Sequence, residues 1–441
     1  MLTRERVSTI FALTIPLTIA LSSSLMMSVV DLAMVAPLGS YATAAVGVSV
    51  FCNTLITAFL VGVAPAVQGL VARRRGERAK EPKCRPLNAG LVAAVLLGVP
   101  LTIAGWFFAP VFLSAINHDA RVVHAGIPFL RTLYLGLVAS GMGLAFKGHW
   151  NGMERPKIYM GIVLFVNVLN FLGDYVLIQG RWGFPVWGVT GAAISTTTSL
   201  YAGLVVKFIL TWKYDREEGF LTAAPNKALV KRIFSLGIPA TVQEFLFSAG
   251  YLVFFWIVGR IGTAELAALN VLVRISLILA VLSMALGSAS ATLVSRTIGE
   301  GDTAGAAEWG WDSGKLGVIS ISLLAAPLVL FPRFFLGLLL SDPRTIEMAL
   351  VPWQLTTATA GLGSLIYIFA YTLVSVGDGN RVALVSFATQ WLLFLPAVWF
   401  VSRRLHSGLL EIALVELAYG AIATVLITAL WTQGRWKTIK I

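Results

Sequence analysis

Long apolar segments recur along the whole chain and are separated by short polar stretches. A helix needs about 20 mostly apolar residues to cross the roughly 30 Å hydrocarbon core of a bilayer. Twelve segments reach that length, which predicts an all-α polytopic membrane protein with twelve transmembrane helices. They cover residues 11–36, 45–71, 88–113, 123–150, 158–179, 188–211, 234–259, 266–296, 313–340, 348–376, 382–402 and 410–433.

The second half of this pattern repeats the first. When the sequence is shifted by 223 residues, 11–77 aligns with 234–300 without a gap and 18 of these 67 positions are identical. An odd-numbered helix falls on an odd-numbered helix, so the two copies have the same orientation and form parallel six-helix repeats. We expect an N-terminal lobe at 1–212, a cytoplasmic linker at 213–233 and a C-terminal lobe at 234–441. Alternating access between the lobes is the mechanism that such repeats favour.

The charged residues orient this bundle. Only 12% of the chain is charged, about half the usual share of a soluble domain. Of the 33 Lys and Arg residues, 22 fall in the terminal segments and even-numbered connections and 6 in the odd-numbered ones. The positive-inside rule therefore predicts both termini in the cytoplasm of a bacterial inner membrane. The net charge of +12 follows from these loops, and no nucleic-acid partner is expected.

Motifs for enzyme chemistry are missing from the sequence. It contains no Walker A string, no His-Glu-x-x-His and no nucleophile elbow. Its two cysteines, Cys52 and Cys84, and its four histidines show no spacing typical of metal ligands. We expect neither an enzyme nor a bound metal or cofactor.

Acidic residues are rare within the apolar segments, and two of them, Asp31 and Asp174, have polar or methionine side chains on the same helix face. Asn167, Asn170 and Asp174 are spaced by three and four residues, so they share one face of the fifth helix. Asp31 shares a face of the first helix with Met27. A charged side chain in the membrane is costly and usually serves a function in an interior cavity. If both aspartates line one cavity, repulsion and lost hydration favour binding of a proton there.

Other residues offer weaker signals for the same cavity. Thr198 in the sixth helix could line it, although bonding between helices explains this residue equally well. Tyr134 in the fourth helix could also line it, but a structural role fits better there. Asp31 falls on Phe254 in the repeat, which favours a site in the N-terminal half only. Pro16 in the first helix is a hinge candidate. Its repeat partner Pro239 favours a shared architectural bend, so both interpretations stay open.

The chain resembles the multidrug and toxic compound extrusion transporters. The resemblance rests on the string Val30-Asp31-Leu-Ala-Met-Val35, on Asn170-x-x-x-Asp174, and on the connections that begin at Gly152 and Gly377. It covers nearly the whole chain. The aspartate in the fifth helix is similar to that of the branch named after DNA-damage-inducible protein F. This resemblance implies an H⁺-coupled exporter of organic cations or drugs whose coupling site is Asp31, Asn170 and Asp174.

Two alternatives lie within the same superfamily. Sodium-coupled members use acids in the seventh and tenth helices. Here Glu244 lies in the seventh helix, but the tenth has no acid before Asp378 at its end. Flippases of lipid-linked sugars often carry two extra helices and a basic cavity, which this sequence does not predict. A membrane-embedded enzyme or a pure scaffold fits less well, because the first needs a catalytic motif and the second needs no buried acids.

Overall fold

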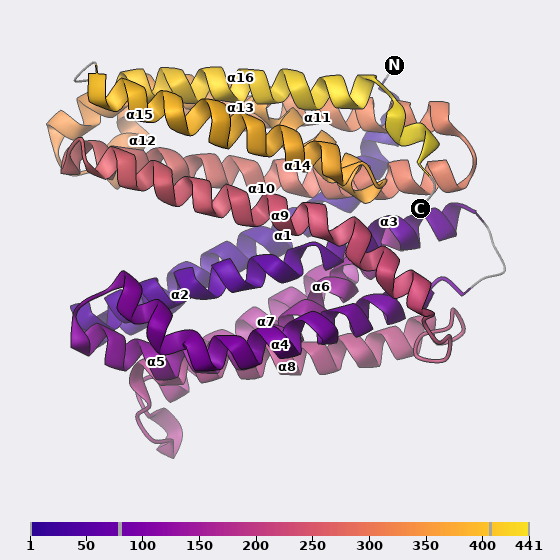
Figure 1. Cartoon of the computed structure of the whole chain (residues 1–441), viewed down its shortest axis with the longest axis horizontal. Coiled ribbons are helices and arrows are strands. Elements are labelled where there is room, and N and C mark those ends of the chain that lie inside the picture. The colour runs from indigo at the N-terminus through magenta and orange to yellow at the C-terminus, as the bar shows by residue number, and fades with distance from the viewer. Residues whose placement is uncertain (1, 78–81, 405–407, 440–441) are drawn as a thin grey trace. The chain divides into compact units, whose positions relative to one another are not determined.

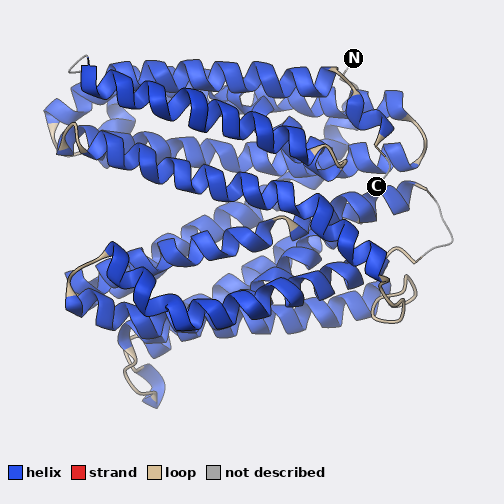
Figure 2. Cartoon of the chain, viewed as in Figure 1, coloured by secondary structure: helices blue, strands red, loops and turns tan. Residues whose placement is uncertain are grey.

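The computed structural model describes residues 2–77, 82–404 and 408–439. These ranges consist of helices joined by loops and turns and contain no strand (Figure 2). Within these ranges, eleven helices are long and apolar enough to span a membrane. The consecutive helices α5 (Ala120–Leu135) and α6 (Leu137–Gly152), which meet at an angle of 42°, make a twelfth when they are taken as one span. The all-α, polytopic prediction is thus confirmed. Arg78, Lys80 and Lys440, which the charge count includes, lie outside the described residues.

The chain divides into two compact units, which we describe separately. The N-terminal unit is Pro16–Thr241 and the C-terminal unit is Met1–Ile15 with Val242–Ile441. These limits differ from the predicted lobes, because residues up to 15 pack with the C-terminal unit and the predicted linker packs with the N-terminal one. The chain crosses between units within α1 (Arg4–Val35), next to Pro16, and within α9 (Lys227–Gly259), shortly after Pro239.

The N-terminal unit is a bundle in which α7 packs on α8, α3 and α4 pack on α6, and α2 packs on α5 (Figure 1). Besides its parts of α1 and α9, it contains the short η1 (Ala36–Leu38) and η2 (Arg181–Gly183) with α2 (Ser40–Val61), α3 (Val63–Gly76), α4 (Arg85–Ile116), α5, α6, α7 (Pro156–Leu177) and α8 (Gly188–Asp215).

Glycines explain one of these contacts directly. Gly148 and Gly152 lie four residues apart on α6 and face α3. A Cβ at Gly148 would collide with the carbonyl oxygen of Ala64, and one at Gly152 would lie 2.9 Å from that of Gln68. Apolar burial drives little helix association in lipid, so close packing of small residues supplies the attraction.

The C-terminal unit packs around α13 (Pro343–Ser375), which contacts α10 (Thr263–Gly299), α11 (Thr303–Leu330) and α16 (Leu409–Thr432). Trp353 of α13 is fully buried and donates from Nε1 to the carbonyl of Leu328, 2.8 Å away. The remaining elements are α12 (Pro332–Leu339), α14 (Gly379–Phe387), the π-helical η3 (Ala388–Phe394), α15 (Leu395–Arg404) and η4 (Arg435–Thr438).

The ninth helix departs from its predicted limits of 313–340. In the structure α11 begins at Thr303, where Asp302 caps the helix by accepting from the N–H of Gly305, and it ends at Leu330. The first turns of α11 are polar, so the hydrophobic pattern did not predict them as part of the helix. Their acidic residues form ion pairs. Arg6 contacts Glu308 at 2.6 Å and Asp312 at 2.7 Å. These pairs bring the first residues of the chain into the C-terminal unit.

The predicted linker is an ordered cap on the N-terminal unit. Phe220 is fully buried and packs against Phe146 and Phe208 at centroid distances of 6.0 and 5.8 Å. Asn88, in the first turn of α4, donates to the carbonyls of Gly219 and Ala223 at 2.9 and 2.8 Å. The linker is therefore fixed to α4, α6 and α8 by side-chain contacts.

Candidate functional site: a buried pair of carboxyl groups

Asp31, Asn170 and Asp174 lie together between α1 and α7, within the N-terminal unit. The Nδ2 of Asn170 donates to Oδ1 of Asp31 at 3.0 Å and to Oδ2 of Asp174 at 3.2 Å. Asp174 is fully buried, Asn170 is 5% exposed and Asp31 is half-buried. One amide thus bridges two carboxyl groups, as the helical spacing on α7 had suggested.

The two carboxyl groups lie close together, because one Asn170 amide reaches both of them. Two such groups can bond to each other only when one of them carries a proton. Across the described part of the chain, no Lys or Arg side chain contacts either group. Two neighbouring carboxyl groups in a buried site cannot both ionise at low cost. The arrangement is suited to hold one proton, or a cation in its place.

A hydroxyl group of α8 supports this site by bonding to the main chain of α7. The Ser195 hydroxyl donates to the main-chain carbonyl of Asn170 at 2.7 Å, and a Cβ at Gly173 would collide with Ser195. The glycine therefore lets α8 approach α7 beside Asp174. Sequence reasoning missed Ser195, although it directly precedes the Thr196–Ser199 run, because only the fold shows which hydroxyl faces α7.

An open groove of about 500 Å³ lies between α1 and α7. Met27 and Asn167, both predicted to line the cavity, are among its lining residues, and Asn167 donates to the Ser23 hydroxyl at 2.7 Å. The rest of the lining is mostly apolar: Thr18, Ile19, Ser22, Ser23, Met26, Val30, Leu164, Val168 and Phe171. Val30 and Phe171 are each the sequence neighbour of a residue in the carboxyl site, so the groove and that site lie along the same stretches of α1 and α7.

Two other predicted cavity residues lie elsewhere. Tyr134 is fully buried in an apolar cluster with Cys52 and Leu130, and the ring fills the space left by Gly105. Thr198 is exposed and its hydroxyl donates to the carbonyl of Ile194 on its own helix at 2.7 Å. Neither side chain contacts the carboxyl pair. Their spacing carried no information on which helix face each occupies.

Pro16 is buried inside α1, and the helix continues through it. Proline cannot donate the helical hydrogen bond that its position would otherwise make. The residue begins the N-terminal unit, and Pro239 lies two residues before the second crossing at Thr241. Both repeated prolines therefore stand where the chain passes from one unit to the other.

A second acidic cluster occupies the C-terminal unit. Glu416 of α16 is near Tyr251, Tyr367 and Tyr419, and Glu244 of α9 is near Tyr367. The sequence shows the two glutamates as isolated acids, because the tyrosines near Glu416 come from three helices.

Cys84, His149 and Asp215 form a buried cluster that the sequence did not predict. The Nε2 of His149 lies 2.9 Å from Oδ2 of Asp215 and 3.9 Å from Sγ of Cys84. Arg155 donates to Oδ1 of Asp215 at 3.0 Å. These residue types can bind zinc, but here the carboxylate already has a cationic partner. Burial, the largest influence, and Asp215 raise the pKa of the Cys84 thiol well above its ordinary value. We interpret the cluster as a clamp that fixes the linker.

Comparison with known proteins agrees with the two-copy arrangement. The MatE family model matches residues 16–176 and again residues 239–400. The two matches begin 223 residues apart (239 minus 16), which is the shift at which the sequence repeats. Together they cover more than half of the chain.

Similar proteins carry names of multidrug resistance. The multidrug resistance protein NorM of Burkholderia vietnamiensis is 29% identical over 350 residues, covering 76% of this chain and 74% of its own. The multidrug resistance protein MdtK of Yersinia pseudotuberculosis is 24% identical over 406 residues, covering 88% and 86%.

Solved structures share the fold. A crystal structure of MATE in complex with MaL6 superposes with a TM-score of 0.87 at 18% identity and covers 96% of this chain and 95% of the other. A MOP superfamily transporter from Pyrococcus furiosus, whose binding pocket is described as having reverse polarity, also gives a TM-score of 0.87 at 18% identity, with the same coverage. From the family match and this fold, we conclude that the chain is a member of the MatE family of membrane transporters.

Proposed function

We propose that this protein is a secondary active exporter of organic cations and drugs, driven by the antiport of protons. The paired carboxyl groups Asp31 and Asp174, bridged by Asn170, are the observation that carries the proposal. The names of the similar NorM and MdtK proteins support multidrug export as the general activity. The protein acts in the bacterial inner membrane with both termini in the cytoplasm, as the positive-inside rule indicates.

Coupling arises because a proton and a cationic substrate compete for the same negative charge. When Asp31 and Asp174 share a proton, the site carries one negative charge. When the proton leaves, it carries two and attracts a cation more strongly. This competition is reciprocal, so the substrate weakens proton binding by the factor by which protons weaken substrate binding.

The groove between α1 and α7 is the proposed binding surface for the apolar part of the substrate. Met26 and Met27 supply flexible, polarizable side chains that adapt to ligands of different shape. Asn167 adds a polar contact one turn before Asn170. An amphipathic cation can thus place its hydrophobic body in the groove and its charge near Asp31.

Alternating access between the two six-helix lobes would deliver the proton and the substrate to opposite sides. The hinge candidate Pro16 lies where α1 leaves one unit for the other. A helix that lacks one hydrogen bond bends more easily at that point. Bending at Pro16 would re-aim the half of α1 that carries Asp31. It would also reshape the groove along the same helix.

A transport assay with imposed gradients tests the proposal. Purified protein is reconstituted into proteoliposomes, and the export of a fluorescent organic cation is followed under a pH gradient, a Na⁺ gradient or neither. The proposal expects uphill transport with the pH gradient alone. It also expects that substrate, added without any gradient, releases protons into unbuffered medium. Uphill transport with the Na⁺ gradient alone would reject proton coupling and leave drug export standing.

Sodium coupling is the alternative that a specific observation favours. Glu416 and Glu244, with Tyr367 nearby, could supply oxygen ligands for a cation in the C-terminal unit. Glu416→Gln removes this charge without touching Asp31 or Asp174. If Na⁺ drives transport, the variant loses Na⁺ dependence. If protons drive it through the N-terminal site, the pH dependence of the variant matches that of the wild type.

A flippase for lipid-linked substrates is the second alternative within the fold. Such a protein would need basic side chains for phosphate groups, whereas the described residues that line the groove between α1 and α7 include no basic one. Failure of every cation in the panel, together with translocation of a fluorescent pyrophosphate-linked lipid, would favour the flippase.

A further inference from the structure

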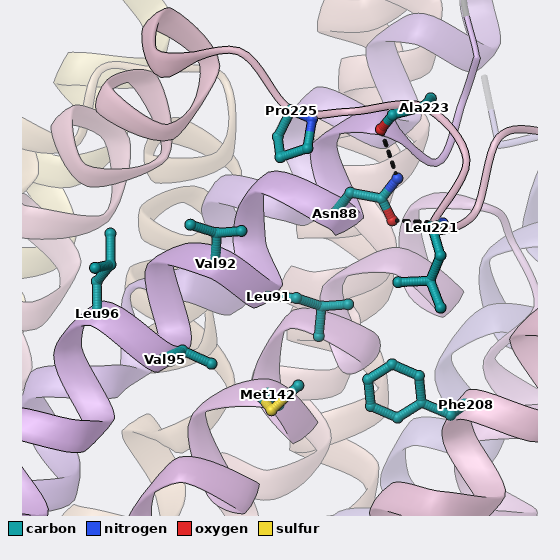
Figure 3. Close-up of a pocket in the computed structure, with 10 residues that line it drawn as sticks. All are labelled: Asn88, Leu91, Val92, Val95, Leu96, Met142, Phe208, Leu221, Ala223 and Pro225. Atoms are coloured by element: carbon teal, nitrogen blue, oxygen red, sulfur yellow. Dashed lines mark hydrogen bonds between the residues drawn. The ribbon is translucent and has the colours of Figure 1, made fainter.

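A second groove, of about 350 Å³, lies on the N-terminal unit next to the linker (Figure 3). Among the described residues that line it, Asn88 is polar and the rest are apolar. The lining comes from α4, α6, α8 and the linker: Asn88, Leu91, Val92, Val95, Leu96, Met142, Phe208, Leu221, Ala223 and Pro225. None of these residues belongs to the carboxyl site or to the groove between α1 and α7.

The position of the groove along α4 places it in the membrane. This helix is a candidate span that begins at Arg85, and each residue advances it by about 1.5 Å. Val92 and Val95 thus lie roughly 10 and 15 Å along the helix from its start, which is within the hydrocarbon of the leaflet on the linker side if the span enters the membrane at Arg85. Both side chains are exposed, at 40% and 38%. Apolar surface at this depth faces acyl chains.

The linker forms a fixed roof over the groove. The N–H of Leu221 donates to Oδ1 of Asn88 at 3.2 Å, and Nδ2 of Asn88 donates to the carbonyl of Ala223 at 2.8 Å. Leu221 has φ +56°, a region that non-glycine residues rarely adopt. Figure 3 shows its side chain directed from the roof toward Leu91 and Phe208. A backbone in this sparsely populated region therefore holds a large apolar side chain over an apolar groove, an arrangement that suits the binding of an apolar ligand.

The rim of the roof is cationic. Arg85 lies one turn before Asn88, and its Nε donates to the carbonyl of Ala224 at 3.3 Å. Lys227 follows two residues after Pro225 and is exposed. The nearby acid Glu218 is paired with Lys83 at 2.5 Å. A guanidinium and an ammonium group at the membrane surface are the groups that bind the phosphate of an anionic lipid.

We propose that this groove binds an anionic phospholipid, with one acyl chain along Val92, Val95 and Phe208 and the headgroup phosphate held by Arg85 and Lys227. The lipid would touch both α4 and the linker, so its presence would stabilise the linker on the N-terminal unit. The site takes no part in the proposed coupling, and its existence does not depend on which ion drives transport.

Lipid retention measured by native mass spectrometry tests the proposal. The purified protein is equilibrated with phosphatidylglycerol or with phosphatidylcholine of the same chains. Val95→Trp fills the groove and is expected to reduce bound phosphatidylglycerol at least tenfold. Val99→Trp, one turn further along α4 and also exposed, is the matched control and should retain it. Arg85→Gln should keep binding but lose the preference for phosphatidylglycerol.

A second measurement uses the unaltered protein, in case a tryptophan variant folds poorly. Phosphatidylglycerol with a photoreactive acyl chain is cross-linked in proteoliposomes and the labelled peptides are identified. Enrichment of label in residues 88–96 and 221–225 is expected. Equal lipid retention in the two tryptophan variants, or label spread evenly over the exposed residues of α4, would overturn the proposal.

Discussion

Asn170 allows a quantitative test, because its single amide group contacts both carboxyls. The two N–H groups on Nδ2 reach Asp31 at 3.0 Å and Asp174 at 3.2 Å. A hydrogen bond to a charged group contributes about 1.5–3 kcal/mol, and it favours the ionised form of the acceptor. Asn170→Ala removes this support and makes the site hold its proton more tightly.

The size of the expected effect follows from these energies. A free-energy change of about 1.4 kcal/mol shifts a titration by one pH unit, so the loss of one such bond moves the midpoint up by about one to two units. The pH at which substrate binding is half-maximal should therefore rise in Asn170→Ala. Substrate binding to the purified protein, measured by fluorescence anisotropy from pH 5 to 9, reports this midpoint directly.

Asn167 provides the matched control. It lies three residues earlier on the same helix and also donates across to α1, but its partner is the hydroxyl of Ser23 at 2.7 Å. Asn167→Ala should weaken substrate binding at every pH without moving the midpoint. If both variants shift the midpoint equally, or if neither does, the bridging role of Asn170 is refuted.

Three further predictions concern the hinge, the linker and the helix packing. Pro16→Ala should leave expression intact and reduce transport, while wild-type transport in this variant would exclude the hinge. The linker is tested by thiol labelling in a Cys52→Ser background. The fully buried Cys84 should react with an impermeant maleimide much more slowly than a cysteine introduced by Glu217→Cys. The reason is that burial raises the pKa of the Cys84 thiol and leaves little thiolate at pH 7. The Glu217→Cys site should label only from the cytoplasmic side, and labelling of intact cells would reverse the proposed orientation. Gly62→Ala should lower the free energy of unfolding by about 1–3 kcal/mol, because its Cβ would collide with the carbonyl of Gly237. In the control variant Gly47→Ala the Cβ meets open space, so the free energy of unfolding should not fall.

Hydrophobic periodicity was sufficient to predict most of the fold. The segment lengths located the spans, and the 223-residue shift predicted the two copies that the family model also finds. The polar start of α11 was not predicted, because charged residues such as Glu308 and Asp312 are typical of loops in a membrane protein. In the structure both pair with Arg6, which lies about 300 residues earlier in the chain. The long-range pairing of the first residues with the C-terminal unit leaves no local signal in the sequence.

For the site, too, residues set by local helix spacing could be predicted, whereas residues that depend on contacts between distant helices could not. The i, i+3 and i+4 rule placed Asn167, Asn170 and Asp174 on one face of α7, and the rarity of intramembrane acids singled out Asp31. Ser195 was not predicted, because its role depends on the contact of α8 with α7 at Gly173. The clamp of Cys84, His149 and Asp215 was also invisible, since its members lie 65 and 66 residues apart in the chain.

Proton-driven efflux by the Asp31→Asn, Asp174→Asn double variant tests the central claim most directly. Each proton that moves down about 100 mV supplies roughly 2.3 kcal/mol, enough for about a fifty-fold substrate gradient per proton. The wild-type protein in proteoliposomes should build such a gradient when a pH gradient and a membrane potential are imposed. In the double variant, amide groups of nearly the same shape replace both carboxyl groups, and the site has no titratable group. The variant should therefore only equilibrate the substrate across the membrane. Uphill efflux at the wild-type rate in the double variant would contradict the account.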